Sequence, residues 1–191
     1  MSRKVSLTTK AHNIIQSYLD VGDFAIDATM GNGHDTLFLG KRVGIAGKVF
    51  GFDIQQQALN STLSKLESEH INNTQLFHVS HSNMDQHIPT QYHKKIKVIM
   101  FNLGYLPGSD KSVITHIDST LLALNQSINL LAPSGIITIT AYPGHPGGDE
   151  ETRLIKQWCN HLSAKQYTVQ IIYSSDKKTA PILFIIQKAE S

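Results

Sequence analysis

Apolar residues recur three or four positions apart in several segments of the chain, the spacing that predicts amphipathic helices. The first helix is expected to end before Gly22, another is expected over residues 34–42, and residues 133–135 (Pro-Ser-Gly) are expected to end a later one. The apolar faces comprise Ala11, Ile14, Ile15, Tyr18 and Leu19; Ala58, Leu59, Leu63 and Leu66; Ile117, Leu121, Leu124, Ile128 and Leu131; and Leu154, Ile155, Trp158 and Leu162.

Short continuous apolar runs alternate with these helices, which predicts buried strands of a parallel sheet. A loop with a short helix is expected between the third and fourth of them. Two further strands close the chain with only a short polar turn between them, so we expect an antiparallel hairpin. The predicted fold is therefore α/β, a Rossmann-like seven-stranded sheet with helices on both faces and one reversed strand at or near its edge. The strands are expected at residues 24–28, 48–53, 75–79, 97–102, 135–141, 167–174 and 181–187.

Composition indicates one globular domain over residues 1–191. Hydrophobic residues make up 40% of the chain and charged residues 17%, which excludes a disordered or charge-dominated protein. The strongest apolar runs, residues 98–101 and 136–139, are far shorter than the roughly 20 residues that span a bilayer. The N-terminus has no signal-peptide pattern, so we expect a cytoplasmic protein. Cys159 is the single cysteine, which excludes an internal disulfide framework.

Charge and histidine content add little to this picture. The formal net charge is +2, too small to indicate a nucleic-acid partner by itself. Local basic groups, Arg3, Lys4 and Lys10 near one end and Lys177 and Lys178 near the other, fit either RNA contacts or ordinary surface charge. No metal site is expected from His78, His81, His87 and His93. If His78 lies within a strand and His81 beyond it, their side chains need not converge, and a site also needs a third ligand fixed in space.

A glycine pair follows the first predicted strand, where ligands of parallel α/β sheets bind. Gly31 and Gly33 fit a nucleotide-binding turn, but they also fit an ordinary tight turn. The third glycine of a dinucleotide motif would stand at Thr36, so that motif is broken. Asp53 ends the next predicted strand, where a carboxylate can accept both hydroxyls of a ribose or can cap the following helix. Together these residues favour an adenosine ligand without a pyrophosphate, namely S-adenosylmethionine.

These residues resemble motifs of the class I S-adenosylmethionine-dependent methyltransferases. Residues 27–33 (Asp-Ala-Thr-Met-Gly-Asn-Gly) are similar to the first motif of that family, and Asp53 is similar to the second. Four segments, residues 27–36, 81–85, 101–111 and 142–148, also resemble a narrower subfamily labelled rRNA methylases. That subfamily includes tRNA 5-aminomethyl-2-thiouridine methyltransferases. The resemblance implies methylation of the aminomethyl nitrogen of the wobble uridine, with the anticodon stem-loop of tRNA as partner.

The resemblance also implies where the cofactor binds. Asp27 would hold its amino group, and the glycine turn would pass beneath its methionine part. Asp35 and Thr36 would lie at a helix N-terminus, which favours the methionine carboxylate. Asp53, at the end of the second predicted strand, would bind the ribose. The adenine would lie beside the loop after the third strand. The implied cofactor-binding residues are Asp27, Gly31, Asn32, Gly33, Asp35, Thr36, Asp53, Gln55, His81, Ser82 and Asn102.

Asn102, Leu103, Gly104 and Tyr105 stand where amine-methylating relatives carry Asn-Pro-Pro-Tyr. By that resemblance the Asn102 amide oxygen would accept hydrogen from the target amine, and Tyr105 would pack on the base. The catalytic candidates are therefore Asn102, Tyr105 and His145, with His145 either a base or a lining residue and Asp110 another candidate base. The expected substrate contacts are Arg3, Lys4, Tyr105, Asp110, Lys111, Tyr142 and His145.

Three alternatives remain open from the sequence. The same scaffold could methylate rRNA, or it could methylate a small molecule. A cofactor-binding protein without turnover is a third reading, which the retained Asn102 and Tyr105 disfavour. Small enzymes of this class often dimerise, so a homodimer is considered as well.

Overall fold

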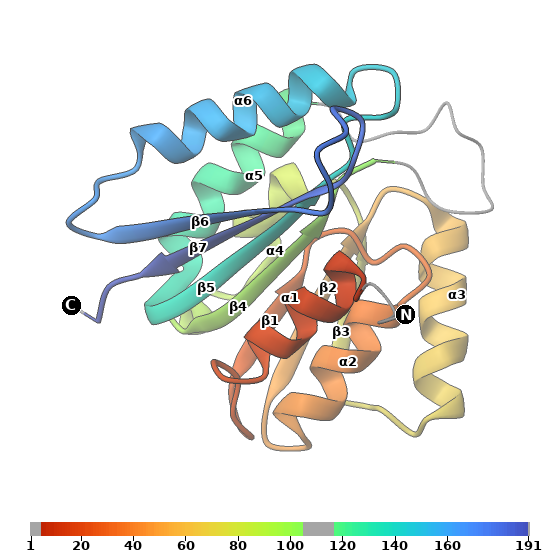
Figure 1. Ribbon diagram of the computed structural model, residues 1–191. Coiled ribbons are helices and arrows are strands. Elements are labelled where there is room, and N and C mark those ends of the chain that lie inside the picture. The colour runs from red at the N-terminus through yellow and green to blue at the C-terminus, as the bar shows by residue number, and fades with distance from the viewer. Residues whose placement is uncertain (1–4, 105–116, 191) are drawn as a thin grey trace.

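A single twisted sheet of seven strands forms the centre of the molecule, in the order β3-β2-β1-β4-β5-β7-β6 (Figure 1). The computed structural model describes residues 5–104 and 117–190. The strands are β1 (Phe24–Asp27), β2 (Lys48–Asp53), β3 (Thr74–His78), β4 (Ile96–Asn102), β5 (Leu131–Ala141), β6 (Tyr167–Tyr173) and β7 (Ile182–Lys188). The predicted α/β sheet with a closing hairpin is confirmed.

Strand direction creates one point at which the order of the sheet reverses. The strands β1 to β5 pair in parallel, whereas β7 pairs antiparallel with both β5 and β6. The reversed strand thus lies one place in from the edge. The chain builds outward from β1 toward β3 and then returns to β4 on the other side of β1. The carboxyl ends of β1 and β4 are therefore the point at which the strand order reverses, where parallel α/β folds have the crevice that binds their ligands.

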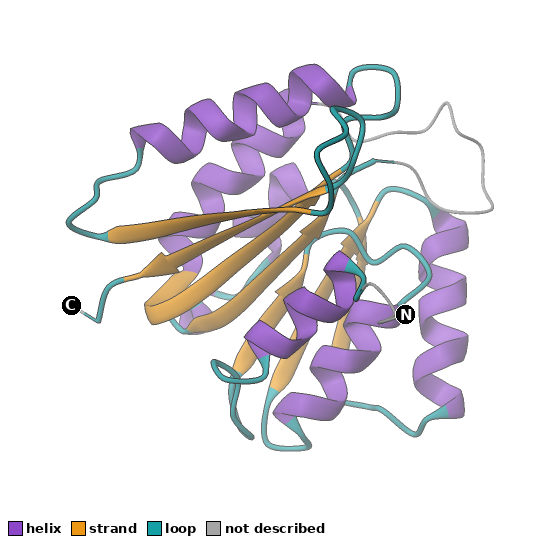
Figure 2. Cartoon of the chain, viewed as in Figure 1, coloured by secondary structure: helices purple, strands orange, loops and turns teal. Residues whose placement is uncertain are grey.

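Helices cover both faces of the sheet (Figure 2). On one face, α1 (Leu7–Ile15) and α2 (His34–Val43) share a core cluster with β1, β2, β4 and β5, while α3 (Gln56–Ser68) packs beside α2. On the other face lie α4 (Met84–His87), α5 (Ile117–Leu130) and α6 (Gly148–His161). Within β4, Val98 and Met100 belong to the first cluster, and Ile99 and Phe101 to the second. This alternation explains why buried strands read as continuous apolar runs.

Two boundaries differ from the sequence-based expectation. Leu131 was expected on a helix but begins β5, because the helix ends at Leu130 and residues 132–135 form an irregularity inside the strand. Ile96 pairs with Leu131 and Val98 pairs with Ile136, and Ser134 adopts a positive φ of 56°. The first helix ends at Ile15, before the expected face is complete.

The inner face of α3 also differs from the expected one. Leu63 is 50% exposed, whereas Thr62 is fully buried. The cause is Gly33, which has no side chain and leaves room for Thr62 to pack against the start of α2. Among residues 5–104 and 117–190, no helix combines the length and the apolar composition needed to span a membrane.

The two leucines of α3 provide a matched test of this packing. Leu66 is 1% exposed and Leu63 is 50% exposed. We expect Leu66→Ala to lower the free energy of unfolding by about 2–5 kcal/mol, because it leaves a cavity in the core. Leu63→Ala should change it by less than about 1 kcal/mol. Urea unfolding measures both, and equal losses would show that α3 packs with a different face.

Candidate active site

The strand ends around the crevice are tied to one another by backbone hydrogen bonds. Ala28 N–H donates to Met100 O, Met30 N–H donates to Phe52 O, and Leu103 N–H donates to Thr140 O. Four strands, β1, β2, β4 and β5, therefore present their carboxyl ends as one continuous edge. The predicted site residues that the structure describes lie along this edge or directly below it.

The glycine turn after β1 has two structural requirements. Gly31 and Gly33 have φ values of 52° and 75°, a region that favours glycine. A Cβ on Gly33 would lie 2.7 Å from Thr62 Oγ1 and 2.8 Å from Thr62 Cα, so a larger residue cannot fit beside α3. Gly33 is also the N-cap of α2 and supplies no side-chain cap. The first N–H groups of α2 are thus left for another acceptor.

Asp53 connects the end of β2 to this turn. Its Oδ2 accepts a hydrogen bond from Gly31 N–H at 2.9 Å, and its Oδ1 accepts one from Gln55 N–H at 2.9 Å. Partial burial raises the pKa of Asp53 above its usual value, although these hydrogen bonds oppose the shift. The carboxylate is therefore fixed beside the glycine turn and is only partly buried.

Ile54 is an apolar residue that the sequence analysis missed. It follows Asp53 directly, and its side chain is 51% exposed. His78 Nε2 lies 2.9 Å from its carbonyl oxygen, which fixes the loop after β2. The available signal was its position, an isoleucine immediately after a strand-end acid. An exposed apolar surface beside a polar one suits a flat, partly apolar ligand.

Asp27 lies beneath the turn and is fully buried. Thr36 Oγ1 donates to its Oδ2 at 2.6 Å, and Thr29 N–H donates to its Oδ1 at 3.2 Å. Burial, followed by the negative charge of Asp35, raises the pKa of Asp27 to about 7. The structure thus pairs Asp27 with Thr36 inside the protein.

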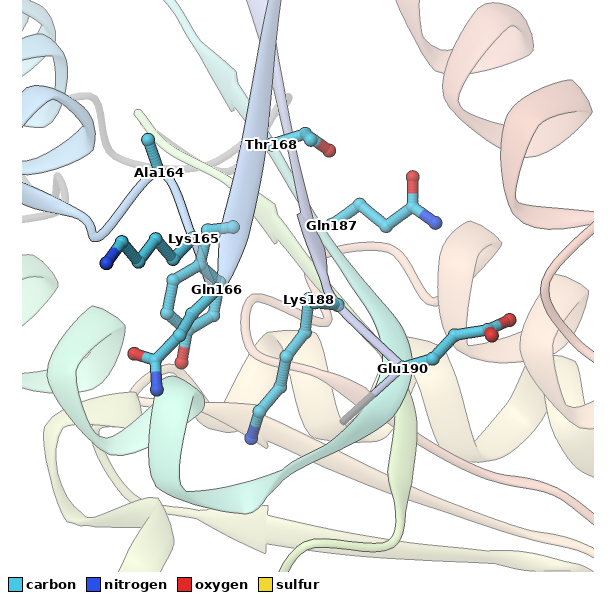
Figure 3. A pocket seen from close by; sticks show the side chains of 9 residues that line it. Ala164, Lys165, Gln166, Thr168, Gln187, Lys188 and Glu190 are labelled. Atoms are coloured by element: carbon cyan, nitrogen blue, oxygen red, sulfur yellow. The ribbon is translucent and has the colours of Figure 1, made fainter.

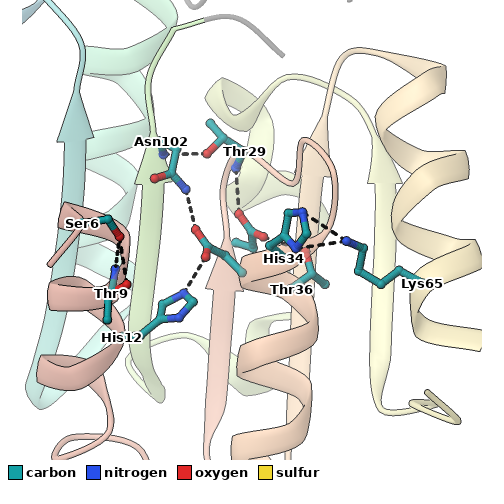
Figure 4. A network of polar contacts seen from close by, with 10 residues as sticks. Ser6, Thr9, His12, Thr29, His34, Thr36, Lys65 and Asn102 are labelled. Atoms are coloured by element: carbon teal, nitrogen blue, oxygen red, sulfur yellow. Dashed lines mark hydrogen bonds and ion pairs between the residues drawn. The ribbon is translucent and has the colours of Figure 1, made fainter. Parts of the chain in front are cut away.

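Asp35 contacts both His12 and Asn102, which are labelled in Figure 4. Its Oδ1 lies 2.6 Å from His12 Nε2, and its Oδ2 accepts a hydrogen bond from Asn102 Nδ2 at 2.5 Å. Asn102 N–H also donates to Thr29 Oγ1 at 2.7 Å. Sequence reasoning identified Asp35 and Asn102 separately but missed His12, since nothing in the spacing links α1 to the start of α2.

His81 is brought against the loop after β1. Its Nδ1 lies 3.2 Å from Ala28 O, and burial lowers the pKa of its imidazole to about 4. The ring is therefore neutral at pH 7, with Nδ1 as donor and Nε2 as a buried acceptor that has no hydrogen-bond partner among the described residues. Beside it, Ser82 O accepts from Gln126 Nε2 at 2.6 Å, which holds this loop on α5.

Tyr142 and His145 follow β5 and lie next to the end of β4. A Cβ on Gly104 would lie 3.6 Å from His145 Nε2 and 3.8 Å from Tyr142 Cδ2. Burial, followed by the negative charge of Asp35, raises the pKa of Tyr142 above its usual value. His145 Nδ1 lies 3.0 Å from Pro146 O. The structure therefore places Tyr142 and His145 beside Gly104, two residues beyond Asn102 in the chain.

Several predicted residues lie outside the part of the chain that the structure describes, namely Arg3, Lys4, Tyr105, Asp110 and Lys111. Among the described basic residues, Lys177 and Lys178 are exposed in the turn between β6 and β7. Because Tyr173 pairs with Ile182, and Ile182 with Ala141, this turn lies at the same edge of the sheet as the site.

The histidines considered for metal binding each contact a backbone carbonyl. Within the described residues, no group of three or more His, Cys, Asp or Glu side chains is arranged to hold a metal ion. The contacts are His78 with Ile54 O, His81 with Ala28 O, His87 with Asn83 O and His93 with Ile88 O. Cys159 is buried in the core, where burial raises the pKa of its thiol to about 12.

A separate hollow lies between β6 and the end of β7, lined by residues 164–168 and 187–190 (Figure 3). Tyr167 pairs with Lys188, and Ile136 near the start of β5 pairs with Gln187. The hollow is therefore at the amino edge of the parallel strands, opposite the candidate site. It contains none of the predicted site residues.

Comparison with known proteins identifies the family. Residues 49–188 match the family model described as "Putative rRNA methylase". The chain belongs to the rRNA methylase family. A crystal structure of a "putative rRNA-methylase" from Clostridium thermocellum is 37% identical, with a TM-score of 0.90, and the match covers 98% of this chain and all of that one. The fold is that of the class I methyltransferases, as predicted.

Two further relatives bear on the chemistry of this family member. A "putative methyltransferase" from Streptococcus mutans in complex with SAH is 34% identical, with a TM-score of 0.84, over 98% of this chain and 99% of that one. A chloroplastic tRNA (mnm(5)s(2)U34)-methyltransferase from Arabidopsis thaliana is 36% identical over 193 residues, which cover 96% of this chain and 70% of that protein.

The buried carboxyl of Asp27 predicts an unusual pH dependence of stability. Its folded pKa of about 7 exceeds the unfolded value of 3.8, so the folded state binds more protons between these values. Stability contributed by this group therefore falls as pH rises through that window, by up to about 1.4 kcal/mol per pH unit.

Asp27→Asn removes this titration. The wild type loses stability from pH 5 to pH 7 through this group, and the variant does not. We therefore expect the free energy of unfolding of Asp27→Asn minus that of the wild type to be larger at pH 7 than at pH 5, as measured by urea unfolding at both values. The comparison with wild type cancels the opposite contribution of His81, whose lowered pKa favours the folded state as pH rises. A difference that is the same at both pH values would contradict the buried, titrating carboxyl.

Proposed function

We propose that the chain transfers a methyl group from S-adenosylmethionine to the aminomethyl nitrogen of wobble 5-aminomethyl-2-thiouridine in tRNA. The observation that carries this proposal is the 36% identity to a tRNA (mnm(5)s(2)U34)-methyltransferase over 96% of the chain. The relative in complex with SAH supports the choice of cofactor, because SAH is S-adenosylmethionine after loss of its methyl group.

The residues at the crevice fit this cofactor. Asp53 offers a fixed carboxylate for the ribose hydroxyls, and the half-exposed Ile54 beside it offers an apolar surface for the adenine. The uncapped N-terminus of α2 suits the methionine carboxylate. His81 Nε2 is an unpartnered acceptor that suits the adenine amino group. When bound, S-adenosylmethionine supplies an electrophilic methyl group on its sulfur.

Other predicted cofactor contacts fall into two groups in this proposal. Asn32, Gln55 and Ser82 lie on the loops around the proposed adenosine site and remain contacts. Asp27 and Thr36 lie below the glycine turn and satisfy each other, so they act by shaping that turn. This role for Asp27 differs from the direct amino-group contact that the resemblance implied.

Asn102 is the residue proposed to align the amine. Its Nδ2 donates to Asp35, so its Oδ1 remains as the acceptor for a hydrogen of the target nitrogen. An amine must present its lone pair to the methyl group, and an acceptor behind it orients that lone pair. Tyr142 and His145 lie beside this position as lining residues, and His145 is suited to take the proton released from the nitrogen.

RNA is proposed to lie across the same edge of the sheet. Lys177 and Lys178 supply exposed positive charge there, and phosphate contacts dominate RNA affinity. Arg3, Lys4 and Lys111 are proposed to extend that surface. Tyr105 and Asp110 are proposed to contact the wobble uridine. We propose that the enzyme acts in the cytoplasm; a tRNA substrate is compatible with that location, and also with the chloroplast of the Arabidopsis thaliana relative. A homodimer is proposed through the exposed edge strand β6, whose backbone has one unpaired side among the described strands.

The ribose assignment predicts a loss of cofactor affinity on changing Asp53. Asp53→Ala should weaken binding of S-adenosylmethionine by about 1.5–3 kcal/mol, since a charged acceptor of two hydroxyls is lost. Asp118→Ala, at an exposed position on α5, is the matched control and should bind as wild type. Isothermal titration calorimetry measures both. Unchanged affinity in Asp53→Ala would remove Asp53 from the ribose site.

The substrate assignment is tested by offering several substrates in parallel. Purified protein with labelled S-adenosylmethionine should methylate tRNA that carries 5-aminomethyl-2-thiouridine, and nucleoside mass spectrometry should find one added methyl on that nucleoside. Ribosomal RNA is the competitor, because the family description names it. Transfer to rRNA in place of tRNA would overturn the tRNA proposal, and absence of transfer to either would favour a small-molecule substrate or a binding protein.

A further inference from the structure

His12 contacts the site from a helix that none of the predicted site residues occupies. Its Nε2 lies 2.6 Å from Asp35 Oδ1, while the other oxygen of Asp35 accepts from Asn102 (Figure 4). We propose that His12 is a positioning residue that acts through Asp35 to set the orientation of the Asn102 amide. This inference rests on the proposed role of Asn102 in amine alignment.

The donor and acceptor roles along this chain of contacts are fixed by chemistry. An ionised carboxylate only accepts hydrogen bonds, so Nε2 of His12 and Nδ2 of Asn102 must both donate to Asp35. The amide oxygen of Asn102 then points away from Asp35, at the other edge of the amide group. If the contact with Asp35 were lost, the amide could turn by 180° and present its NH2 group to the target amine. A donor at that position would repel the hydrogens of the amine.

His12 holds Asp35 in place because it is itself held. Its ring stacks on Phe38 with centroids 3.8 Å apart and an interplanar angle of 3°. The helix α1 that carries it is anchored by Leu7, Ala11 and Ile15 in the core. The side chains of His12 and Asp35 are 21% and 7% exposed, so water competes weakly for their contact. The imidazole is therefore a rigid donor that fixes one carboxylate oxygen and aims the other at β4.

The backbone of Asn102 is held by a hydrogen bond of its own, so only the side-chain amide depends on Asp35. Its backbone N–H donates to Thr29 Oγ1 at 2.7 Å, which holds the end of β4 independently of Asp35. Removing His12 therefore leaves the strand end in place and frees only the amide. The expected effect is on the rate of methyl transfer, not on the position of the loop.

Two substitutions at His12 separate the donor from the ring. His12→Phe keeps an aromatic ring for the stack on Phe38 and removes the donor, whereas His12→Gln keeps an N–H donor near the position of Nε2 and removes the ring. We expect His12→Phe to slow single-turnover methylation of aminomethyl tRNA by about tenfold or more, with affinity for S-adenosylmethionine within about threefold of wild type. His12→Gln should recover most of the rate. Equal loss in both variants would mean that His12 only supports the fold, and would overturn the inference.

A double-mutant cycle tests the route through Asp35. Asp35→Asn alone should slow transfer, and adding His12→Phe to it should cause little further loss, because the two residues act through one contact. Multiplicative losses would contradict the proposal. The rates of all four proteins are compared at a temperature at which each is folded, so a lower melting temperature of His12→Phe does not affect the result.

Asn102→Ala separates this inference from the function it rests on. If Asn102→Ala is slow while His12→Phe reacts at the wild-type rate, the positioning role of His12 is wrong and the proposed function stands. If Asn102→Ala itself reacts at the wild-type rate with aminomethyl tRNA, the amine-alignment role of Asn102 fails, and the inference about His12 fails with it.

Discussion

The carboxylate of Asp35 is the contact at which the two halves of the site meet. It stands in the first turn of α2, accepts from Asn102 at the end of β4 and faces His12 on α1. Two side chains that are 23 and 67 residues away from it in sequence are thus held on one group. The position of the crevice comes from the strand order, but the orientation of the side chains in it depends on this group.

Three aspartates near the crevice differ in environment, and their roles follow from it. Asp27 is sealed beneath the glycine turn, where burial raises its pKa to about 7 and Thr36 supplies a partner. Asp53 is only partly buried while backbone N–H groups hold both oxygens, which suits contact with a ligand. Asp35 is nearly buried but lies between two side-chain donors. Similar residues at neighbouring strand ends thus serve packing, binding and orientation.

The spacing of apolar residues predicted those helices and strands whose buried face consists of apolar side chains. The five parallel strands and the closing hairpin were predicted from short buried runs and from the missing helix between the last two strands. The glycine turn and Asp53 were also visible, since each needs only a residue type at a strand end. The start of β5 was misplaced, because the irregularity at residues 132–135 depends on pairing with β4.

Contacts between distant side chains could not be predicted in this way. The exposure of Leu63 and the burial of Thr62 depend on the missing side chain of Gly33 on a neighbouring helix. The partnership of His12 with Asp35 leaves no mark in the spacing of apolar residues. Residue types therefore indicated which groups carry the chemistry, and only the packing of α1, α2 and β4 showed how one group constrains another.

A structure of the protein with SAH and an anticodon stem-loop carrying 5-aminomethyl-2-thiouridine tests the central claim most directly. We expect the aminomethyl nitrogen to lie about 3 Å from Asn102 Oδ1, a hydrogen-bond distance, with Asn102 Nδ2 still on Asp35. The nitrogen should point toward the sulfur of SAH. A wobble base bound elsewhere, or an amine nitrogen with no contact to Asn102, would contradict the proposed alignment of the amine.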